Sequence, residues 1–194
     1  MLWLRVPAIA TLSAVLGASA LGCAGTERAR RFPAALRAGP RPEGRGLARS
    51  RLQRGDESAA FVERALHRAG LRFGTDGSIG ALWGYLRTSH EVVDAADARP
   101  GDVVFFDTRG TGPTPDCADH AGIVERVDGD GQLGFVEVRG GTVRHSFVDP
   151  SRPTIRRDER GQIVNSFLRE KRITDPPETR YFAGEMLCAI ARPR

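Results

Sequence analysis

The stretch that decides the fold runs from Arg99 to Arg139 and reads RPGDVVFFDTRGTGPTPDCADHAGIVERVDGDGQLGFVEVR. It holds three short apolar runs, at residues 103–106, 121–127 and 133–138. Turn signals bound these runs, namely Pro100-Gly101 before the first and Asp128-Gly129-Asp130-Gly131 between the second and the third. Such runs, separated by Gly, Pro and Asp, are typical of strands joined by tight turns. The stretch therefore predicts an antiparallel meander.

A histidine and a glutamate stand at matching ends of two neighbouring strands. His120 begins the second strand, and Glu137 lies near the end of the third. Across a tight hairpin, the start of one strand lies opposite the end of the next. We therefore expect the imidazole of His120 beside the carboxylate of Glu137 at one end of the sheet.

Two helices are predicted before the meander. The first follows Asp56-Glu57-Ser58 and ends at Gly70, and its apolar residues recur at helical spacing: Phe61, Ala65, Leu66 and Ala69. The second is capped by Ser78 and ends near Ser89, with an apolar stripe of Ile79, Leu82, Trp83 and Leu86.

The last third of the chain is less regular. Gly140-Gly141 turns the chain into a fourth predicted strand, residues 142–148. Residues 149–180 hold prolines and many charges around one short apolar run, Ile163 to Leu168. From Tyr181 to Ala191 the apolar residues have helix-like spacing. We expect a helix or an edge element there that packs on the sheet, with a closing strand as the alternative.

The motif Pro100-Gly101-Asp102-Val103-Val104-Phe105-Phe106, followed by His120-Ala121-Gly122-Ile123-Val124, resembles a known family. Papain-like bacterial cell-wall hydrolases of the NlpC and CHAP (cysteine, histidine-dependent amidohydrolase/peptidase) groups carry this pattern, and the resemblance covers residues 55 to 148. It implies an α+β, papain-like fold, with a nucleophile helix packed on an antiparallel sheet of about five strands, in a domain spanning residues 55–194. It also implies an exported hydrolase of peptide amide bonds in peptidoglycan.

The resemblance assigns roles to three residues. These hydrolases begin the nucleophile helix with Asp-Cys-Ser-Gly-Phe-Val, and the same frame here reads ESAAFV from Glu57, so Ser58 takes the place of the catalytic cysteine. His120 matches the catalytic histidine, and Glu137 matches the acidic residue that orients it. A serine hydroxyl needs a general base that removes its proton during attack, and His120 held by Glu137 has the parts for this.

Two functions stay open on these residues. One is a hydrolase with Ser58 as nucleophile, His120 as base and Glu137 as orienting residue. The other is a catalytically inactive family member that binds wall peptide or a protein partner. Serine is also among the best helix N-caps, which gives Ser58 a purely structural alternative.

The candidate substrate contacts are Trp83, Tyr85 and Arg139. In the resembling family the segment around Trp83 borders the substrate groove, although packing in the core is the alternative for this side chain. Arg139 stands where these sites often carry an asparagine, and a cation there would compete for the Glu137 carboxylate. The sequence has no zinc spacing, and the Asp128 turn lacks the glutamate of a calcium loop. We predict no metal and no cofactor.

The first 54 residues are interpreted as a signal peptide followed by a tether. Residues 1–23 have a positive Arg5, an apolar run and a final Gly22-Cys23, which is typical of a lipoprotein signal that is acylated on Cys23. Ordinary cleavage after Ala20 is the alternative. Residues 24–54 form an Arg-, Pro- and Gly-rich stretch that we interpret as a disordered tether. We expect an exported lipoprotein, anchored to a membrane in the periplasm or cell envelope.

The net charge of +5 does not by itself indicate nucleic acid. All but one of the basic residues are arginines, and no nucleic-acid motif accompanies them, so we interpret the charge as a solvated, mildly basic surface on a monomer whose partner is peptidoglycan or wall peptide. In an exported protein Cys117 and Cys188 can pair as a disulfide, and two buried thiols are the alternative.

Overall fold

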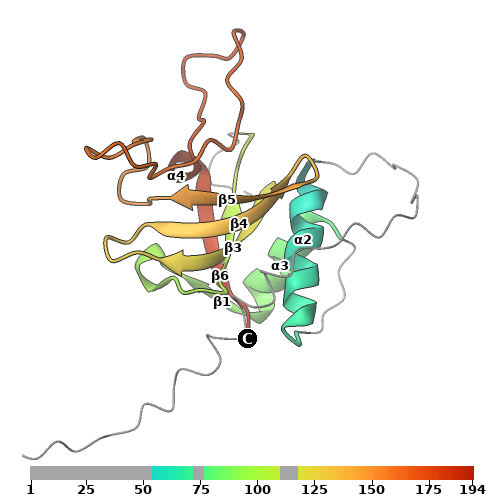
Figure 1. Ribbon diagram of the computed structural model, residues 1–194. Coiled ribbons are helices and arrows are strands. Elements are labelled where there is room, and N and C mark those ends of the chain that lie inside the picture. The colour runs from blue at the N-terminus through green and yellow to red at the C-terminus, as the bar shows by residue number, and fades with distance from the viewer. Residues whose placement is uncertain (1–53, 72–76, 110–117) are drawn as a thin grey trace, which may run out of the picture.

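The computed structural model describes residues 54–71, 77–109 and 118–194 (Figure 1). The predicted signal, its lipidation site Cys23, the tether up to residue 53 and the Cys117 loop lie outside the described residues. Within the described ranges, no helix is long and apolar enough to span a membrane.

A six-stranded antiparallel sheet in the order β1-β6-β2-β3-β4-β5 forms the centre of the fold. Its strands are β1 (Glu91–Val93), β2 (Val103–Phe106), β3 (His120–Val127), β4 (Leu133–Arg139), β5 (Thr142–Val148) and β6 (Leu187–Arg192). The predicted meander is the run from β2 to β5, and the Asp128 turn closes a hairpin in which the Asp128 N–H donates to the Gln132 carbonyl over 2.8 Å. The α+β class is confirmed, with six strands rather than about five.

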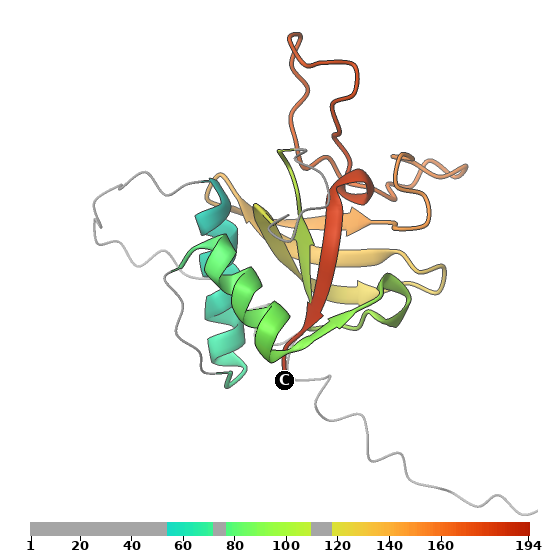
Figure 2. The same ribbon diagram turned by 180° about the vertical axis from the view of Figure 1, so that it is seen from behind.

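Two helices, α2 (Arg54–Arg68) and α3 (Ile79–Ser89), lie side by side against one face of the sheet (Figures 1 and 2). The end of α2 at Gly70 is confirmed: this residue has φ 90°, and the N–H groups of Gly70 and Leu71 close the last turn. The predicted cap of α3 is also confirmed, because the Ser78 hydroxyl accepts a hydrogen bond from the Ala81 N–H at 3.1 Å.

The sheet has a core on each face, which explains why every residue of β2 is buried. Alternate side chains of a strand point to opposite faces, so Val103 and Phe105 pack under the helices while Val104 and Phe106 face the other way. On that second face the cover comes from the C-terminal third of the chain. Its buried apolar residues are Leu168, Ala183 and Met186.

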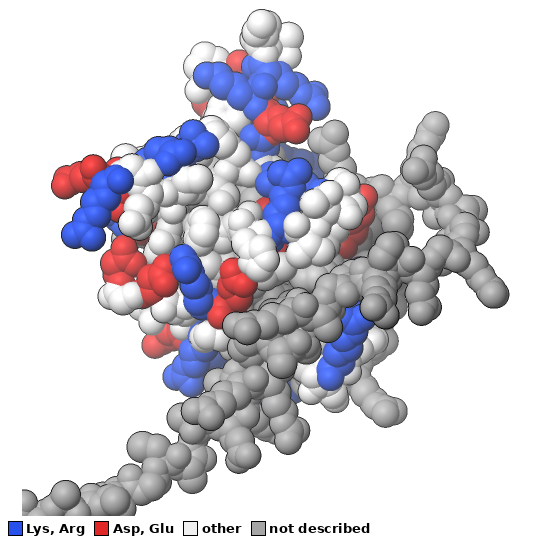
Figure 3. Space-filling model, viewed as in Figure 1, with Lys and Arg blue, Asp and Glu red and all other residues white. Residues whose placement is uncertain are grey.

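Residues 149–182 form an irregular stretch, which we call the covering segment, that rises from the end of β5 (Figure 1). Ser166 joins it to the outer edge of β5, since its N–H donates to the Phe147 carbonyl and its hydroxyl accepts from the Phe147 N–H, both at 2.9 Å. Figure 3 shows basic and acidic side chains interspersed over this part of the surface. The segment therefore completes a core and presents a surface of mixed charge.

The preferred expectation for the last residues, a helix or an edge element, was wrong, and the alternative of a strand is confirmed for residues 187–192. A single helical turn, α4 (Ala183–Met186), is followed by β6, which lies between β1 and β2 and not at an edge. The short strand β1 was not predicted, nor was the 3-10 turn η1 (Ala95–Asp97). The helix-like spacing misled because both faces of β6 pack on a core, through Ala191 on one face and Ile190 on the other, so the strand does not need strict alternation of apolar and polar residues.

The Pro-Gly-Asp motif has a structural role at the start of β2. Gly101 has φ 100°, which suits glycine, and its N–H donates to the Val124 carbonyl over 2.8 Å. The buried Asp102 carboxylate accepts two hydrogen bonds from the guanidinium of Arg192, at 3.1 and 3.0 Å, and one from the Arg99 N–H at 2.8 Å. This motif fastens the final strand to the rest of the sheet.

Candidate active site

A bulge in the hairpin between β3 and β4 determines which side chains share a face. Val127 lies opposite Leu133, but beyond a register shift between Val124 and Arg126 it is Gly122 that lies opposite Glu137. Without the extra residue, Glu137 would lie opposite Ile123 and project from the other face. The bulge therefore places Glu137 on the face that also carries His120.

His120 and Glu137 form a buried pair there, as predicted. The His120 Nε2 atom is hydrogen-bonded to the Oε2 atom of Glu137, and the two residues are 6% and 0% exposed. The other carboxylate oxygen, Oε1, accepts from the Ser146 hydroxyl at 2.6 Å and from Nη2 of Arg139 at 3.3 Å. The pair and its partners come from three adjacent strands, β3, β4 and β5.

These partners decide the charge of the carboxyl group. Burial by itself raises the pKa of Glu137, because it penalises the charged form. The hydrogen bond and charge of His120, the Ser146 hydroxyl and the charge of Arg139 outweigh burial and hold the pKa of Glu137 below its ordinary value. The group is therefore a carboxylate at neutral pH and can only accept hydrogen bonds.

The imidazole has one ring nitrogen left for other chemistry. Because Nε2 is engaged by Glu137, Nδ1 is the nitrogen that could exchange a proton with a nucleophile or a substrate. In the residue before His120, the Asp119 carboxylate accepts hydrogen bonds from the N–H and the hydroxyl of Thr108, at 2.8 and 2.9 Å. The Asp119 N–H donates to the Phe106 carbonyl at 3.0 Å, so the chain that enters β3 is held on both sides.

Ser58 reaches the same end of β3 from α2. Its hydroxyl oxygen accepts a hydrogen bond from the Ala121 N–H at 3.1 Å, one residue beyond His120, and the side chain is fully buried. The start of α2 is docked by Glu57, whose Oε2 atom accepts from the Gly141 N–H at 2.9 Å. The structure thus pairs His120 with Glu137 and bonds Ser58 to the backbone of Ala121, the residue after the histidine.

Ser58 is not the N-cap of its helix, which was the structural alternative to a catalytic role. Because α2 begins at Arg54, Ser58 is the fifth helical residue and does not cap the helix. Only the first four N–H groups of a helix lack a partner within it, so the Ser58 N–H lies beyond the turn where the helix dipole acts most strongly.

The candidate substrate contacts separate into two groups. Trp83 is 7% exposed and packs against Phe105 with ring centroids 5.0 Å apart, in the core beneath the helices. Tyr85 lies on the same helix, and its ring contacts that of His90 at 4.9 Å. Arg139 is the member of the set that contacts the pair. Sequence reasoning missed Ser146, because one serine in a strand gives no signal of a buried partner.

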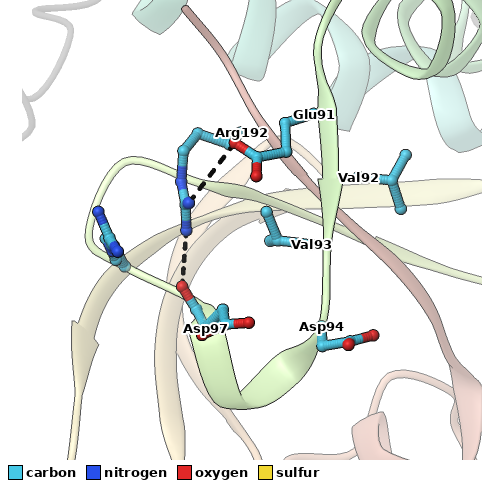
Figure 4. A pocket seen from close by; sticks show the side chains of 7 residues that line it. Glu91, Val92, Val93, Asp94, Asp97 and Arg192 are labelled. Atoms are coloured by element: carbon cyan, nitrogen blue, oxygen red, sulfur yellow. Dashed lines mark hydrogen bonds and ion pairs between the residues drawn. The ribbon is translucent and has the colours of Figure 1, made fainter.

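A polar hollow of about 360 Å³ lies at the other end of the sheet (Figure 4). It is lined by Glu91, Val92, Val93, Asp94, Asp97, Arg99 and Arg192. Arg192 spans it and donates to the Asp97 carbonyl at 2.6 Å as well as to Asp102. Asp102 and His120 flank opposite ends of β2, so this hollow is separate from the candidate site.

The remaining predicted residues have simple positions. His67 is exposed, and His145 is an exposed partner of Glu125, with 3.0 Å between Nδ1 and Oε1. Among the residues that the structure describes, no cluster of three or more His, Cys, Asp or Glu side chains could hold a metal ion. Cys188 in β6 is disulfide-bonded, and its partner lies outside the described ranges, which contain no second cysteine.

No protein-family model and no curated protein sequence matches this chain. Among solved structures, the chain is similar to a crystal structure of N-acetylmuramoyl-L-alanine amidase from Staphylococcus aureus, a cell-wall amidase, with a TM-score of 0.34 and 20% sequence identity. The similarity covers 46% of this chain and 26% of that one. A likeness of this size carries no argument about activity, which has to come from the residues of the site.

Proposed function

We propose that this protein is an exported peptidoglycan amide hydrolase that acts with a serine nucleophile. The observation that carries the proposal is the buried hydrogen bond between His120 and Glu137, with the hydroxyl of Ser58 bonded to the backbone of the next residue. A hydroxyl nucleophile and a general base oriented by a carboxylate are the groups that serine hydrolases use on several unrelated folds.

Each residue has a defined step in this reaction. The Ser58 oxygen attacks the carbonyl carbon of a peptide amide while its proton moves to Nδ1 of His120. Glu137 accepts the hydrogen bond from Nε2 and stabilises the imidazolium that forms. His120 then gives the proton to the leaving amine, and the acyl group stays on Ser58. Water, deprotonated by His120, releases the acid and restores the hydroxyl.

A second function is favoured by a different observation. Ser58 is 0% exposed and lies one turn inside its helix, so a substrate can reach its hydroxyl only after neighbouring groups move. A thiolate, moreover, forms near neutral pH with the help of a helix N-terminus, whereas a hydroxyl does not. These facts support a catalytically inactive member that binds wall peptide or a protein partner.

The deciding experiment compares four forms of the protein on isolated peptidoglycan: native, Ser58→Ala, Ser58→Cys and His120→Ala. The hydrolase predicts soluble peptide fragments from the native protein and their loss in Ser58→Ala and His120→Ala. The matched control is His145→Ala, which removes an exposed histidine that also pairs with a glutamate and should leave product release unchanged.

The outcomes separate the two functions. If only Ser58→Cys releases fragments, the site is intact except for its nucleophile and the native protein is not a hydrolase. If none of the forms releases fragments but the native protein sediments with peptidoglycan, the binding function holds.

The proposed export and lipid anchoring can be tested separately. A diacylglyceryl group on Cys23, detected by mass spectrometry of the membrane fraction, supports a membrane-anchored lipoprotein facing the periplasm or cell envelope. A mature protein that begins at Leu21 would replace that proposal with ordinary signal cleavage after Ala20.

A further inference from the structure

Arg139 is the residue at which the covering segment contacts the buried pair. Its Nη1 atom donates to the backbone carbonyl of Phe167 at 2.7 Å, and its Nη2 atom donates to Oε1 of Glu137 at 3.3 Å. The two nitrogens belong to one rigid, planar guanidinium group. A displacement of the Phe167 carbonyl therefore moves the group that holds the Glu137 carboxylate.

The region around Phe167 is well attached to its surroundings. Its ring packs against that of Phe182 with centroids 5.0 Å apart, and the Arg156 guanidinium lies 4.6 Å from the ring centroid. On either side of Phe167, the Ser166 N–H donates to Phe147 at 2.9 Å and the Leu168 N–H donates to Tyr181 at 3.0 Å. Arg139 thus joins an ordered part of the covering segment to the pair.

Ser146 offers a natural comparison within the same site. It donates to the same carboxylate oxygen as Arg139, at 2.6 Å, but it lies in β5 and its side chain carries no charge. The charged groups that contact Glu137 are His120 from β3 and Arg139 from its own strand, and the exposed Arg144 of β5 lies directly opposite Glu137 in the sheet. Arg139 therefore differs from Ser146 in its charge and in its bond to the covering segment.

We propose that Arg139 is a positioning residue that makes the placement of the His120–Glu137 pair depend on the docking of the covering segment. The guanidinium holds the carboxylate on one side and the Phe167 carbonyl on the other. Loosening of residues 166–168 frees Glu137, and loss of Glu137 loosens residues 166–168. The consequence for catalysis rests on the proposed hydrolase function, but the coupling itself does not.

The test measures both sides of the guanidinium in the full-length protein by NMR. One readout is the titration of the Glu137 side-chain carboxyl carbon, and the other is amide hydrogen exchange at Ser166 and Leu168. Arg139→Gln is expected to raise the pKa of Glu137 and to speed exchange at both amides about tenfold, because a charge-assisted hydrogen bond is lost.

Two control variants isolate the coupling. Ser146→Ala is expected to raise the pKa of Glu137 while leaving exchange at Ser166 and Leu168 within about twofold of the native rate. Arg64→Gln removes an equal charge from an exposed side chain in α2, and both readouts should stay at their native values.

Arg139→Lys is the substitute test variant if Arg139→Gln does not fold. It keeps the positive charge near Glu137, but a single ammonium group cannot reproduce the two-ended fork. Exchange at Ser166 and Leu168 should rise in this variant while the carboxyl titration stays near native. Native exchange rates in the folded Arg139→Gln or Arg139→Lys protein would overturn the proposal, as would an unchanged carboxyl titration in Arg139→Gln.

These readouts need no substrate, so they distinguish this proposal from the hydrolase proposal. A protein that releases no wall fragments but shows both NMR changes would fail as a hydrolase and keep the coupling. If the native protein is active, Arg139→Gln should lower kcat about ten- to a hundredfold with little change in KM, since the base is misplaced while the peptide still binds.

Discussion

Two buried carboxylates lie near opposite ends of β2 and β3, and they differ in the groups that bind them. Asp102 receives both ends of the Arg192 guanidinium and a backbone N–H, so permanent donors bind both of its oxygens. Glu137 divides its oxygens between an imidazole on one side and a hydroxyl and a guanidinium on the other. Only the second carboxylate has an imidazole among these partners, and this ring carries a second nitrogen, Nδ1, that is not bonded to the carboxylate.

The difference explains why the Pro-Gly-Asp motif and the histidine motif have different roles. An arginine stays charged at every physiological pH, so the Asp102–Arg192 pair only fastens strands together. The partners of Glu137 fix its charge while leaving Nδ1 of His120 available. Burial of a carboxylate is thus compatible with either role, and the chemical nature of its partner decides between them.

The largest expected effect is the loss of Glu137. Glu137→Ala leaves His120, Ser146 and Arg139 facing a cavity without their shared acceptor, so we expect a fall of about 3–5 kcal/mol in the free energy of unfolding. Urea unfolding at neutral pH measures it. A fall below about 1 kcal/mol would show that water replaces the carboxylate and that the site is more open than its burial indicates.

Loss of the other carboxylate should cost less. Asp102→Ala removes one of two carboxylate partners of Arg192, whose side chain is 19% exposed and keeps its ion pair with Glu91 and its bond to the Asp97 carbonyl. We expect the free energy of unfolding to fall by about 2–3 kcal/mol in the same urea experiment. The NMR signals of the His120 ring should stay unchanged, and a change in them would contradict the separation of the two ends.

Acid should destabilise the protein partly through Glu137. Its pKa in the folded state lies below the value of about 4.5 for an unperturbed glutamate, so its contribution to stability is complete above that pH and is lost as the pH falls through the folded value. Between the unfolded and the folded pKa, the native protein should therefore lose up to about 1.4 kcal/mol per pH unit relative to Glu137→Gln. Parallel stability curves from pH 7 to pH 3 would refute this expectation.

The smallest effect is expected at the exposed counterpart of the buried pair. His145 bonds to Glu125 at 3.0 Å, but its side chain is 67% exposed. His145→Gln should change the free energy of unfolding by less than about 0.5 kcal/mol, because water screens exposed ion pairs. Thermal or urea unfolding measures the change. A larger value would mean that the exposed pair contributes to stability despite solvent screening, and that exposure does not explain the difference between the two histidine–glutamate pairs.

Local signals predicted much of the framework. Turn residues and short apolar runs predicted the meander, and Ser78 and Gly70 marked helix ends that the structure has at those residues. The contact between His120 and Glu137 was predicted from their places at the start of one strand and near the end of the next. All of these depend on residues close in sequence, whose preferences act before distant parts of the chain meet.

Other features depend on partners far away in the sequence. The run Leu187–Arg192 is an inner strand because it pairs with β1 on one side and with β2 on the other. The helix-like spacing of its apolar residues does not indicate these pairings. The contact of Arg139 with Phe167 is made to a backbone carbonyl, and a carbonyl has no sequence signature. The burial of Ser58 likewise depends on how α2 docks against β3.

The sequence by itself determined the four strands from β2 to β5, their turns and the kinds of side chain available, because these follow from backbone preferences and from spacing along the chain. Only the tertiary structure decided that one extra residue in β3 turns Glu137 to the face of His120, and that Ser146 and Arg139 hold its other oxygen. The physical reason is that a one-residue shift in register moves every side chain of a strand to the opposite face, and burial then strengthens whichever polar contacts result.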